Sequence, residues 1–399
     1  MYEKLRQDPI KLRWLFIGSL IINTGISFIW PLTTIYMHEY LHETLTVAGI
    51  VLLFNSGFTM IGNYLGGWLF DHWWPYLTIL GGIAIATIST GLLIFWHGWP
   101  TYAILLVTLG LGNGIVATGI NSIATLVKSR QPSYVFNVLY FTSNLGLVFG
   151  SLIVGYILPL GIQYIFTIAF VLFVLFFVMA LITFRQLDQS KQAAKQHAAV
   201  VSDRLERTRE KLPIILLLLT LFVSWVAYEQ WQSNISAYMI HLGMDVKLYS
   251  HLWTVNAVLI VVLQPLLTHF DDFLLKHLRG RLYTGFFLFC TSFLILLFAK
   301  QFAWFVLAMS VLTIGEIIAF PAVSTFVNER ASFAEKGRYQ GLVALSASAG
   351  RAVGPLIGAL IIESFTYPIL FIFSAVLIAV FTVVFMTSGI KRQTNRRQS

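Results

Sequence analysis

The sequence predicts an all-α membrane protein in which twelve transmembrane helices form two six-helix bundles related by pseudo-symmetry. Of its 399 residues, 57% are hydrophobic and 11% are charged, whereas a soluble domain usually carries about 25% charged residues. The mean hydropathy is +0.79. The 26 Lys and Arg residues and the 17 Asp and Glu residues are too few to cover the surfaces of soluble domains of this total length. The composition therefore indicates a membrane protein with many spans.

Apolar segments long enough to cross a bilayer recur along the whole chain, since a helix needs about 20 largely apolar residues to do so. The first six spans are expected near residues 13–37, 46–70, 75–97, 101–127, 134–158 and 161–184. Six more are expected near residues 213–240, 248–270, 281–300, 302–328, 338–363 and 366–387. The first segment is longer than the apolar core of a signal peptide, so we expect it to remain as a span.

A polar stretch separates the two sets of spans. It holds almost no apolar residues that could be buried and many residues that favour helices, which is typical of a surface helix or a flexible linker. The sequence therefore predicts an N-terminal bundle of residues 1–185 and a cytoplasmic linker of residues 186–211. The C-terminal bundle, with a cytoplasmic tail, is expected to comprise residues 212–399.

The two halves resemble each other in sequence. Gly146 and Gly150 in the fifth span are four residues apart and are followed by Leu-Ile, and Gly350 and Gly354 in the eleventh span show the same pattern. The second and the eighth spans both end in Phe-Asp. A six-plus-six repeat with a substrate site at the interface of the repeats is typical of transporters.

Basic residues gather in alternate loops. If the N-terminus is cytoplasmic, the cytoplasmic segments hold 23 of the 26 Lys and Arg residues, the external segments hold Lys247 and Lys300, and Arg351 lies within a span. This asymmetry predicts that both termini are cytoplasmic. It also accounts for the net charge of +9, so we expect no nucleic-acid partner.

Three segments of the C-terminal half resemble motifs of a known family. They are Gly315-Glu316-Ile-Ile-Ala-Phe-Pro321, Gly337-Arg-Tyr-Gln-Gly341 and Gly350-Arg351-Ala-Val-Gly354-Pro355-Leu-Ile-Gly358. Together with the twelve spans, they make the chain similar to the major facilitator superfamily, and especially to the LmrP-type multidrug transporters of its drug:proton antiporter branch. The resemblance implies the major facilitator fold and transport driven by the proton gradient, with no other cofactor.

The loop after the second span resembles part of the gating motif of that family. Gly67-Trp-Leu-Phe-Asp71 has the Gly and the Asp of the motif, but His72-Trp-Trp-Pro replaces the basic residues that usually follow. The resemblance implies that Gly67 and Asp71 belong to a gating loop. Asp71 can serve there by facing the N-terminus of a helix or the basic residues of a neighbouring span.

Three charged residues lie well inside predicted spans, where a charge costs roughly 2.5–3.5 kcal/mol on insertion scales and is often functional. Glu316 and Glu229 are the candidates for proton coupling, because protonation changes the desolvation cost of a carboxyl group and thereby biases the transport cycle. Arg351 is always charged and is the candidate charge partner of either acid. The alternatives are a Glu316 that stays neutral and bonds to a neighbouring helix, an external gate at Glu229, and an Arg351 that reaches the cytoplasmic surface.

Polar and aromatic residues at helical spacing are candidates for the lining of a substrate cavity, although such residues can simply bond adjacent helices. In the N-terminal half they are Asn23, Ser27, Trp30, Thr34, Asn113, Asn121, Tyr140 and Asn144. In the C-terminal half they are Tyr228, Gln232, Ser233, Ser236 and Trp253. Gln232, Ser233 and Ser236 are expected to share one helix face with Glu229, and the aromatic residues suit an apolar site on which a cation stacks.

These features favour a secondary active transporter that works by alternating access and exports amphiphilic or cationic drugs in exchange for protons. The alternatives are a proton-coupled symporter that imports peptides, sugars or another small nutrient, and a transporter of lipids or lysolipids. The N-terminal spans have no charged residue well inside them, which favours an amphiphilic substrate. The sequence contains no metal-ligand cluster, nucleophile–base set or phosphate-binding loop, so we expect neither an enzyme nor a metal site. We expect a monomer in the plasma membrane.

Overall fold

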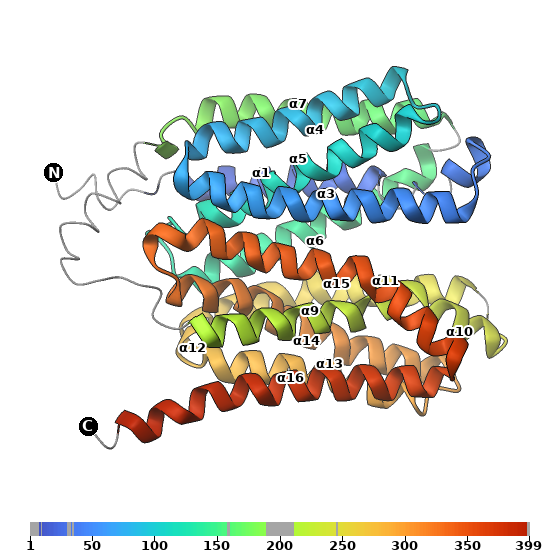
Figure 1. The fold of residues 1–399 in the computed structure, drawn as a ribbon, viewed down its shortest axis with the longest axis vertical. Helices are drawn as coiled ribbons and strands as arrows, with labels where there is room; N and C mark the ends of the chain where they lie inside the picture. The colour runs from blue at the N-terminus through green and yellow to red at the C-terminus, as the bar shows by residue number, and fades with distance from the viewer. Residues whose placement is uncertain are drawn as a thin grey trace. The chain divides into compact units, whose positions relative to one another are not determined.

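The computed structural model describes residues 8, 10–29, 33, 36–157, 160–188, 211–244 and 246–396. Among these residues, twelve helices contain eighteen residues or more, and no β-strand occurs (Figure 1). Ten of the twelve are long and apolar enough to cross a membrane. The long helices match the predicted spans one for one, so the predicted all-α membrane fold is confirmed.

The described chain forms two compact units. The first contains the N-terminal helices together with Ala331–Leu345, and the second contains Thr208–Arg330 and Ser346–Ser399. The start of the eleventh long helix therefore belongs, by its contacts, to the N-terminal unit, which the sequence did not indicate. Most of the predicted linker lies outside the described residues, and the predicted domain boundaries stay a prediction.

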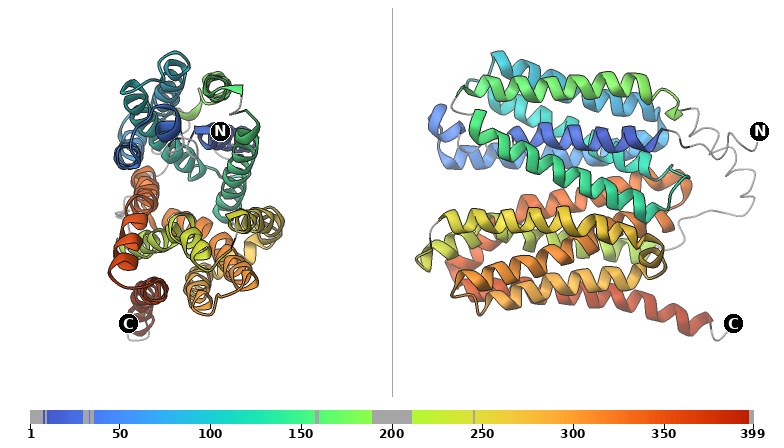
Figure 2. Two further views of the ribbon diagram at one scale, coloured as in Figure 1. Left: turned by 90° about the vertical axis from the view of Figure 1, so that its right-hand side faces the viewer. Right: turned by 180° about the vertical axis from the view of Figure 1, so that it is seen from behind.

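The first unit consists of long helices that alternate in direction (Figures 1 and 2). The pairs α1 and α6, α3 and α5, and α4 and α7 pack against each other. The helices are α1 (Leu12–Ile29), α3 (Leu45–His72), α4 (Pro75–Phe95), α5 (Thr101–Ala124), α6 (Pro132–Ile157) and α7 (Ile162–Thr183). The described part of α1 reaches Ile29, residues 30–32 and 34–35 lie outside the described residues, and a short π-helical turn, η2 (Tyr36–Tyr40), comes next among the named elements.

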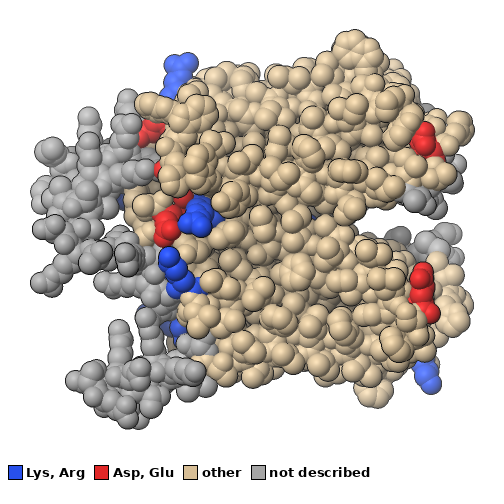
Figure 3. All heavy atoms as spheres, in the orientation of Figure 1, with Lys and Arg blue, Asp and Glu red and all other residues tan. Residues whose placement is uncertain are grey.

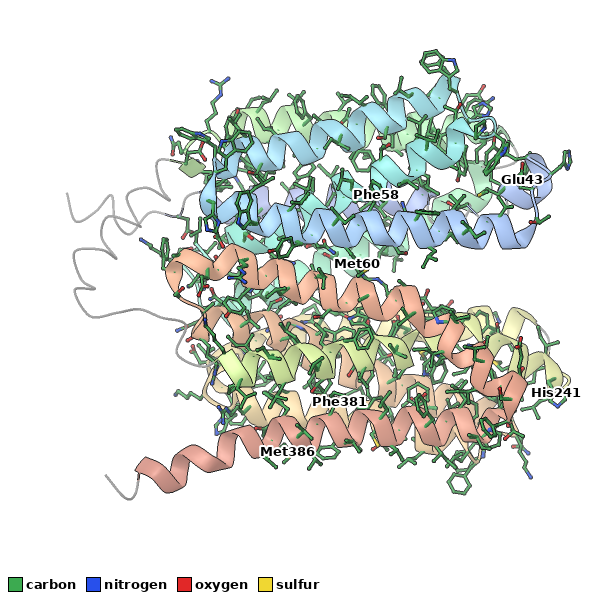
Figure 4. The ribbon with its side chains drawn as sticks, viewed as in Figure 1. Glu43, Phe58, Met60, His241, Phe381 and Met386 are labelled. Atoms are coloured by element: carbon green, nitrogen blue, oxygen red, sulfur yellow. The ribbon has the colours of Figure 1, made fainter. Side chains whose placement is uncertain are left out.

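The second unit contains α9 (Lys211–Ser233), α10 (Ile235–His241), α11 (Val246–His269), α12 (Asp271–Lys276), α13 (Leu278–Leu296), α14 (Phe302–Arg330), most of α15 (Lys336–Ser364) and α16 (Tyr367–Arg396). The start of α15 and the 3-10 turn η4 (Phe333–Glu335) lie in the first unit. His241, which Figure 4 labels at the end of α10, stacks on Tyr367 at the start of α16.

The continuous helix predicted over residues 213–240 is interrupted by a turn at Asn234. The Asn234 side chain donates a hydrogen bond to Gln230 Oε1 at 2.7 Å. Ser236 therefore lies on α10 rather than α9, although the N–H of Asn234 still donates to the carbonyl oxygen of Gln230 and that of Tyr238 to the carbonyl oxygen of Asn234. Whether Ser236 continues the helix face of Glu229 stays a prediction.

Charged side chains gather at the ends of the helices, and the surface of the described residues between them is uncharged in the view of Figure 3. In the first unit the basic end holds Lys11 and Arg13 before and within the first turn of α1, Lys128 and Arg130 after α5, and Arg185 after α7. Because consecutive helices alternate in direction, these positions share one end of the unit. Such a distribution suits helices whose middle parts lie in lipid.

Helices α3 and α5 approach each other closely through glycine. A Cβ atom at Gly114 would lie 2.8 Å from the backbone nitrogen of Asn63 and still closer to the carbonyl oxygen of Thr59. Small residues at such positions permit van der Waals contact between backbones, which stabilises helix association in membranes. This pair of helices therefore depends on the absence of a side chain at residue 114.

We expect Gly114→Val to lower the thermal unfolding temperature of the purified protein, because overpacking typically costs about 1–3 kcal/mol. Gly81→Val is the matched control, since a Cβ atom at Gly81 meets nothing within 4 Å. Both variants are compared with the unaltered protein by thermal unfolding in detergent. Equal stability of the two variants would contradict the close approach of α3 and α5.

Candidate functional site

Glu316 lies in the middle of α14, and its side chain is only 3% exposed. Its Oε2 atom accepts hydrogen bonds from the Tyr228 hydroxyl at 3.3 Å and from Asn256 Nδ2 at 3.0 Å. Asn256 Nδ2 also lies 2.9 Å from Thr313 Oγ1, one turn earlier on α14. The carboxyl group thus links α9, α11 and α14 through two uncharged donors, which can serve its neutral and its ionised form alike.

Glycine brings α13 against α14 beside Glu316. A Cβ atom at Gly315 would lie 2.8 Å from the carbonyl oxygen of Gly285. Further along α14, Arg281 of α13 donates from Nε to the carbonyl oxygen of Ile318 at 2.7 Å. This bond lies close to Pro321, which has no N–H to donate within its helix. The segment that carries Glu316 is therefore fixed on α13 from both sides.

Aromatic rings surround Tyr228. Its ring centroid lies 6.3 Å from those of Phe289 and Phe320 and 6.2 Å from that of Trp253. Trp225 stacks on Phe320, with ring centroids 4.8 Å apart and an interplanar angle of 17°. Such offset aromatic arrays offer large apolar surfaces and, at their faces, a negative electrostatic potential.

Arg351 and Glu229 form a second charged feature, on α15 and α9. Arg351 is half-buried; its Cζ lies 4.5 Å from the ring centroid of Trp225, and its Nη2 donates to Ser348 Oγ at 2.9 Å. Glu229 is 4% exposed and attracts Arg351 electrostatically. Its Oε1 atom has no hydrogen-bond partner among the described residues. Gly354 lets α15 approach here, since a Cβ atom on it would lie 2.8 Å from Glu229 Cβ.

The sequence does not determine whether Arg351 pairs with Glu316 or with Glu229. In the structure its electrostatic partner is Glu229, whereas the hydrogen bonds described for Glu316 come from the uncharged Tyr228 and Asn256. The two predicted coupling acids therefore lie in different environments of one unit. Their role in proton coupling stays a prediction.

Two predicted cavity residues of the first unit join α1 to α6. Asn23 Nδ2 donates to the carbonyl oxygen of Ser19 at 2.7 Å and to Ser143 Oγ at 3.2 Å. Ser27 Oγ lies 3.3 Å from the carbonyl oxygen of Gly146. These bonds agree with the alternative that such residues hold adjacent helices together. Trp30 and Thr34, predicted on the same side of this span, lie outside the described residues.

The other predicted cavity residues are dispersed. Asn144 Nδ2 donates to the carbonyl oxygen of Tyr140 within α6, and Ser233 Oγ donates to that of Glu229 within α9. Asn113 Oδ1 is buried and has no partner among the described residues. Asn121 and Gln232 are half-buried. Whether any of these residues lines a substrate cavity stays a prediction.

Asp71, at the end of α3, caps the start of α15 within the first unit. Its Oδ1 accepts the backbone N–H of Gly337 at 3.1 Å, and its Oδ2 accepts that of Arg338 at 2.6 Å. A Cβ atom at Gly67, one turn earlier, would lie 3.2 Å from the Cα atom of Arg338. Unpaired N–H groups and the helix dipole make a helix start a favourable place for a carboxylate. This geometry is one of the two arrangements expected for Asp71.

Sequence reasoning missed several residues of the Glu316 cluster, namely Trp225, Asn256, Phe289, Thr313 and Phe320. A usable signal exists for Asn256, because Leu252, Ile260 and Gln264 recur with it every four residues and are all buried. A polar residue on such a ridge faces protein rather than lipid. The other four residues are apolar or common within helices, and nothing in their spacing distinguishes them.

Comparison with known proteins agrees with the fold. The family model described as Major Facilitator Superfamily matches residues 15–344 and, again, residues 279–398. YttB of Bacillus subtilis (strain 168), an uncharacterized MFS-type transporter, is 37% identical over 395 residues, which cover 98% of this chain and 99% of YttB. YqjV of the same organism, also an uncharacterized MFS-type transporter, is 21% identical over 90% of this chain and 88% of its own.

Solved structures with low sequence identity share the fold. The human organic anion transporter MFSD10 (TETRAN) gives a TM-score of 0.74 at 14% identity over 94% of this chain and 98% of that chain. The proton:xylose symporter XylE gives a TM-score of 0.73 at 13% identity over 94% of each chain. At these identities the likeness concerns the fold alone.

We expect Asp71→Asn to destabilise the protein by about 2 kcal/mol, because hydrogen bonds to a charged group contribute roughly 1.5–3 kcal/mol. The Asn amide places an N–H donor against one of the two backbone donors. Thermal unfolding of the purified variant measures the loss. Asp272→Asn is the control, since Asp272 is exposed on α12. If both variants unfold at the same temperature, Asp71 does not hold the start of α15.

Proposed function

The chain belongs to the major facilitator superfamily, a family of membrane transporters, and we propose that it exports amphiphilic or cationic small molecules in exchange for protons by alternating access. The proton gradient is the only energy source that this proposal requires. We place the protein in the plasma membrane as a monomer. We also propose that both termini lie in the cytoplasm, because Lys and Arg concentrate in cytoplasmic loops of membrane proteins.

The observation that carries the proposal is the buried carboxyl group of Glu316 between the Tyr228 hydroxyl and the Asn256 amide. Loss of the proton leaves a charge that is costly to hold away from water. Its protonation state therefore favours one conformation of the transporter over another, and a ligand or proton shifts such an equilibrium only through this kind of difference.

The aromatic rings around Tyr228 support an amphiphilic or cationic substrate. Trp225 and Trp253 are half-buried and lie beside the buried Phe289 and Phe320, and aromatic faces attract organic cations. A sugar needs many hydrogen-bonding groups instead. The fold itself serves other transport as well, since XylE is a proton:xylose symporter and MFSD10 an organic anion transporter. The alternative function is import of a small nutrient together with the proton, and the experiment must distinguish it from export in exchange for protons.

Asp71 and Gly67 supply the proposed gate of the cytoplasmic side. The Asp71 carboxylate holds the N-terminus of α15 by two backbone hydrogen bonds. We propose that these bonds form in one conformation of the transport cycle and break in the other. Their rupture frees two N–H groups and one carboxylate for water, so the exchange costs little when the gate becomes hydrated.

We expect Glu316→Gln to abolish uphill transport while the protein stays folded, because Gln keeps the hydrogen-bonding shape but carries no exchangeable proton. Proteoliposomes with an imposed pH gradient are loaded with ethidium, and dye movement and internal pH are followed together. In the unaltered protein, dye moves against its gradient as protons move the other way. Glu363→Gln is the matched control, since Glu363 is exposed near the end of α15, and it should retain exchange.

Uphill dye transport by Glu316→Gln would disprove the coupling role. If the protein does not transport ethidium but carries peptides or sugars into the proteoliposomes together with protons, it is a symporter. In that case Glu316→Gln should stop the symport as well.

A further inference from the structure

The ring of Trp225 contacts both an aromatic ring and a cation of the protein. Phe320 stacks on one face, with centroids 4.8 Å apart and planes 17° from parallel. The guanidinium carbon of Arg351 lies 4.5 Å from the same centroid. A cation of the protein itself therefore occupies an aromatic surface of the candidate site.

Few hydrogen bonds are described for Arg351 in this position. Its described hydrogen bond is to Ser348 Oγ, one turn away on its own helix, although a guanidinium has five N–H donors. Glu229 attracts it electrostatically, but Glu229 Oε1, on a side chain that is 4% exposed, has no partner among the described residues. A buried carboxylate oxygen without a donor is rare in folded proteins and calls for an explanation.

We propose that Trp225 and Glu229 form a binding site for planar organic cations that carry N–H donors, and that the Arg351 side chain occupies this site in the absence of substrate. Aryl guanidinium and amidinium compounds represent this ligand class. Such a cation stacks on Trp225 in place of Arg351 and donates a hydrogen bond to Glu229 Oε1. The inference rests on the proposed function, of which it specifies the substrate class.

Exchange of one cation for another explains why a site with an arginine can prefer cations. The negative charge of Glu229 keeps a cation beside it before and after binding, and the aromatic face never lacks a positive partner. A neutral ligand cannot replace the positive charge of the Arg351 guanidinium beside Glu229. An anion would bind to Arg351 where it already lies, and it would meet the like charge of Glu229.

The first test is equilibrium binding to the purified full-length protein in nanodiscs, measured calorimetrically with phenylguanidinium, its neutral analogue phenylurea, and benzoate. Arg351→Ala removes the internal cation, so we expect the phenylguanidinium affinity to rise at least tenfold, with less than a twofold change for phenylurea. The double variants Trp225→Leu/Arg351→Ala and Glu229→Gln/Arg351→Ala should lose this gain. Lys300→Ala, an exposed basic residue at a helix end, should change nothing.

Arg351→Lys guards against a variant that fails to fold, because it keeps the charge next to Glu229. An ammonium group is more strongly hydrated than a guanidinium and lacks its plane, so we expect about a threefold gain in phenylguanidinium affinity. Size-exclusion chromatography and thermal unfolding establish that each variant is folded.

Two results would overturn the inference. One is an unchanged or lowered phenylguanidinium affinity in both Arg351 variants, and the other is benzoate binding that disappears with Arg351→Ala, which would make Arg351 an anion site. If the unaltered protein still exchanges ethidium for protons in either case, the proposed function survives without this site. A selective gain in Arg351→Ala without ethidium–proton exchange would support the site and contradict the drug-export function.

Discussion

A charged side chain that lies away from water needs a compensating partner inside the protein, and this constraint organises the second unit. Its two buried acids meet the constraint in different ways. Glu316 takes hydrogen bonds from the uncharged Tyr228 and Asn256. Glu229 has the charge of Arg351 nearby, and its Oε1 atom has no donor among the described residues. The helices α9, α11, α14 and α15 are thereby tied to one another by polar groups that the surrounding apolar residues cannot replace.

In the first unit, several of the described polar residues connect helices, and others bond to the backbone of their own helix. Asn23 and Ser27 bond α1 to α6, and Gly114 allows α5 to touch the backbone of α3. Interhelical hydrogen bonds of this kind contribute on average only about 0.6 kcal/mol each in membrane proteins, so close backbone packing must supply much of the cohesion. The two buried acids that we propose for proton coupling both lie in the second unit.

The arrangement of spans was predictable because length and hydropathy are local properties, and the twelve helices follow the predicted ranges. Contacts between helices were not predictable in this way. Glu316, Glu229 and Arg351 stood out in the sequence as charges within apolar segments, but Trp225 and Phe320 are ordinary residues of membrane helices until α9 and α14 bring them together. The turn at Asn234 and the attachment of Ala331–Leu345 to the first unit likewise depend on partners that a single sequence does not identify.

The position of Tyr228 and Glu229 next to each other on α9 gives the proposed substrate site a physical route to the proposed proton site. Tyr228 donates to Glu316, Glu229 attracts Arg351, and Trp225, one turn earlier, carries the Arg351 guanidinium on its ring. A helix turn moves as one piece, because its backbone is fixed by hydrogen bonds between residues four apart. When a cation displaces Arg351 and draws Glu229 toward itself, the same turn of α9 shifts the Tyr228 hydroxyl relative to Glu316. In the proposed mechanism, exchange at Trp225 thereby changes the hydrogen bonding of Glu316, and the two proposed sites are coupled through a single helix.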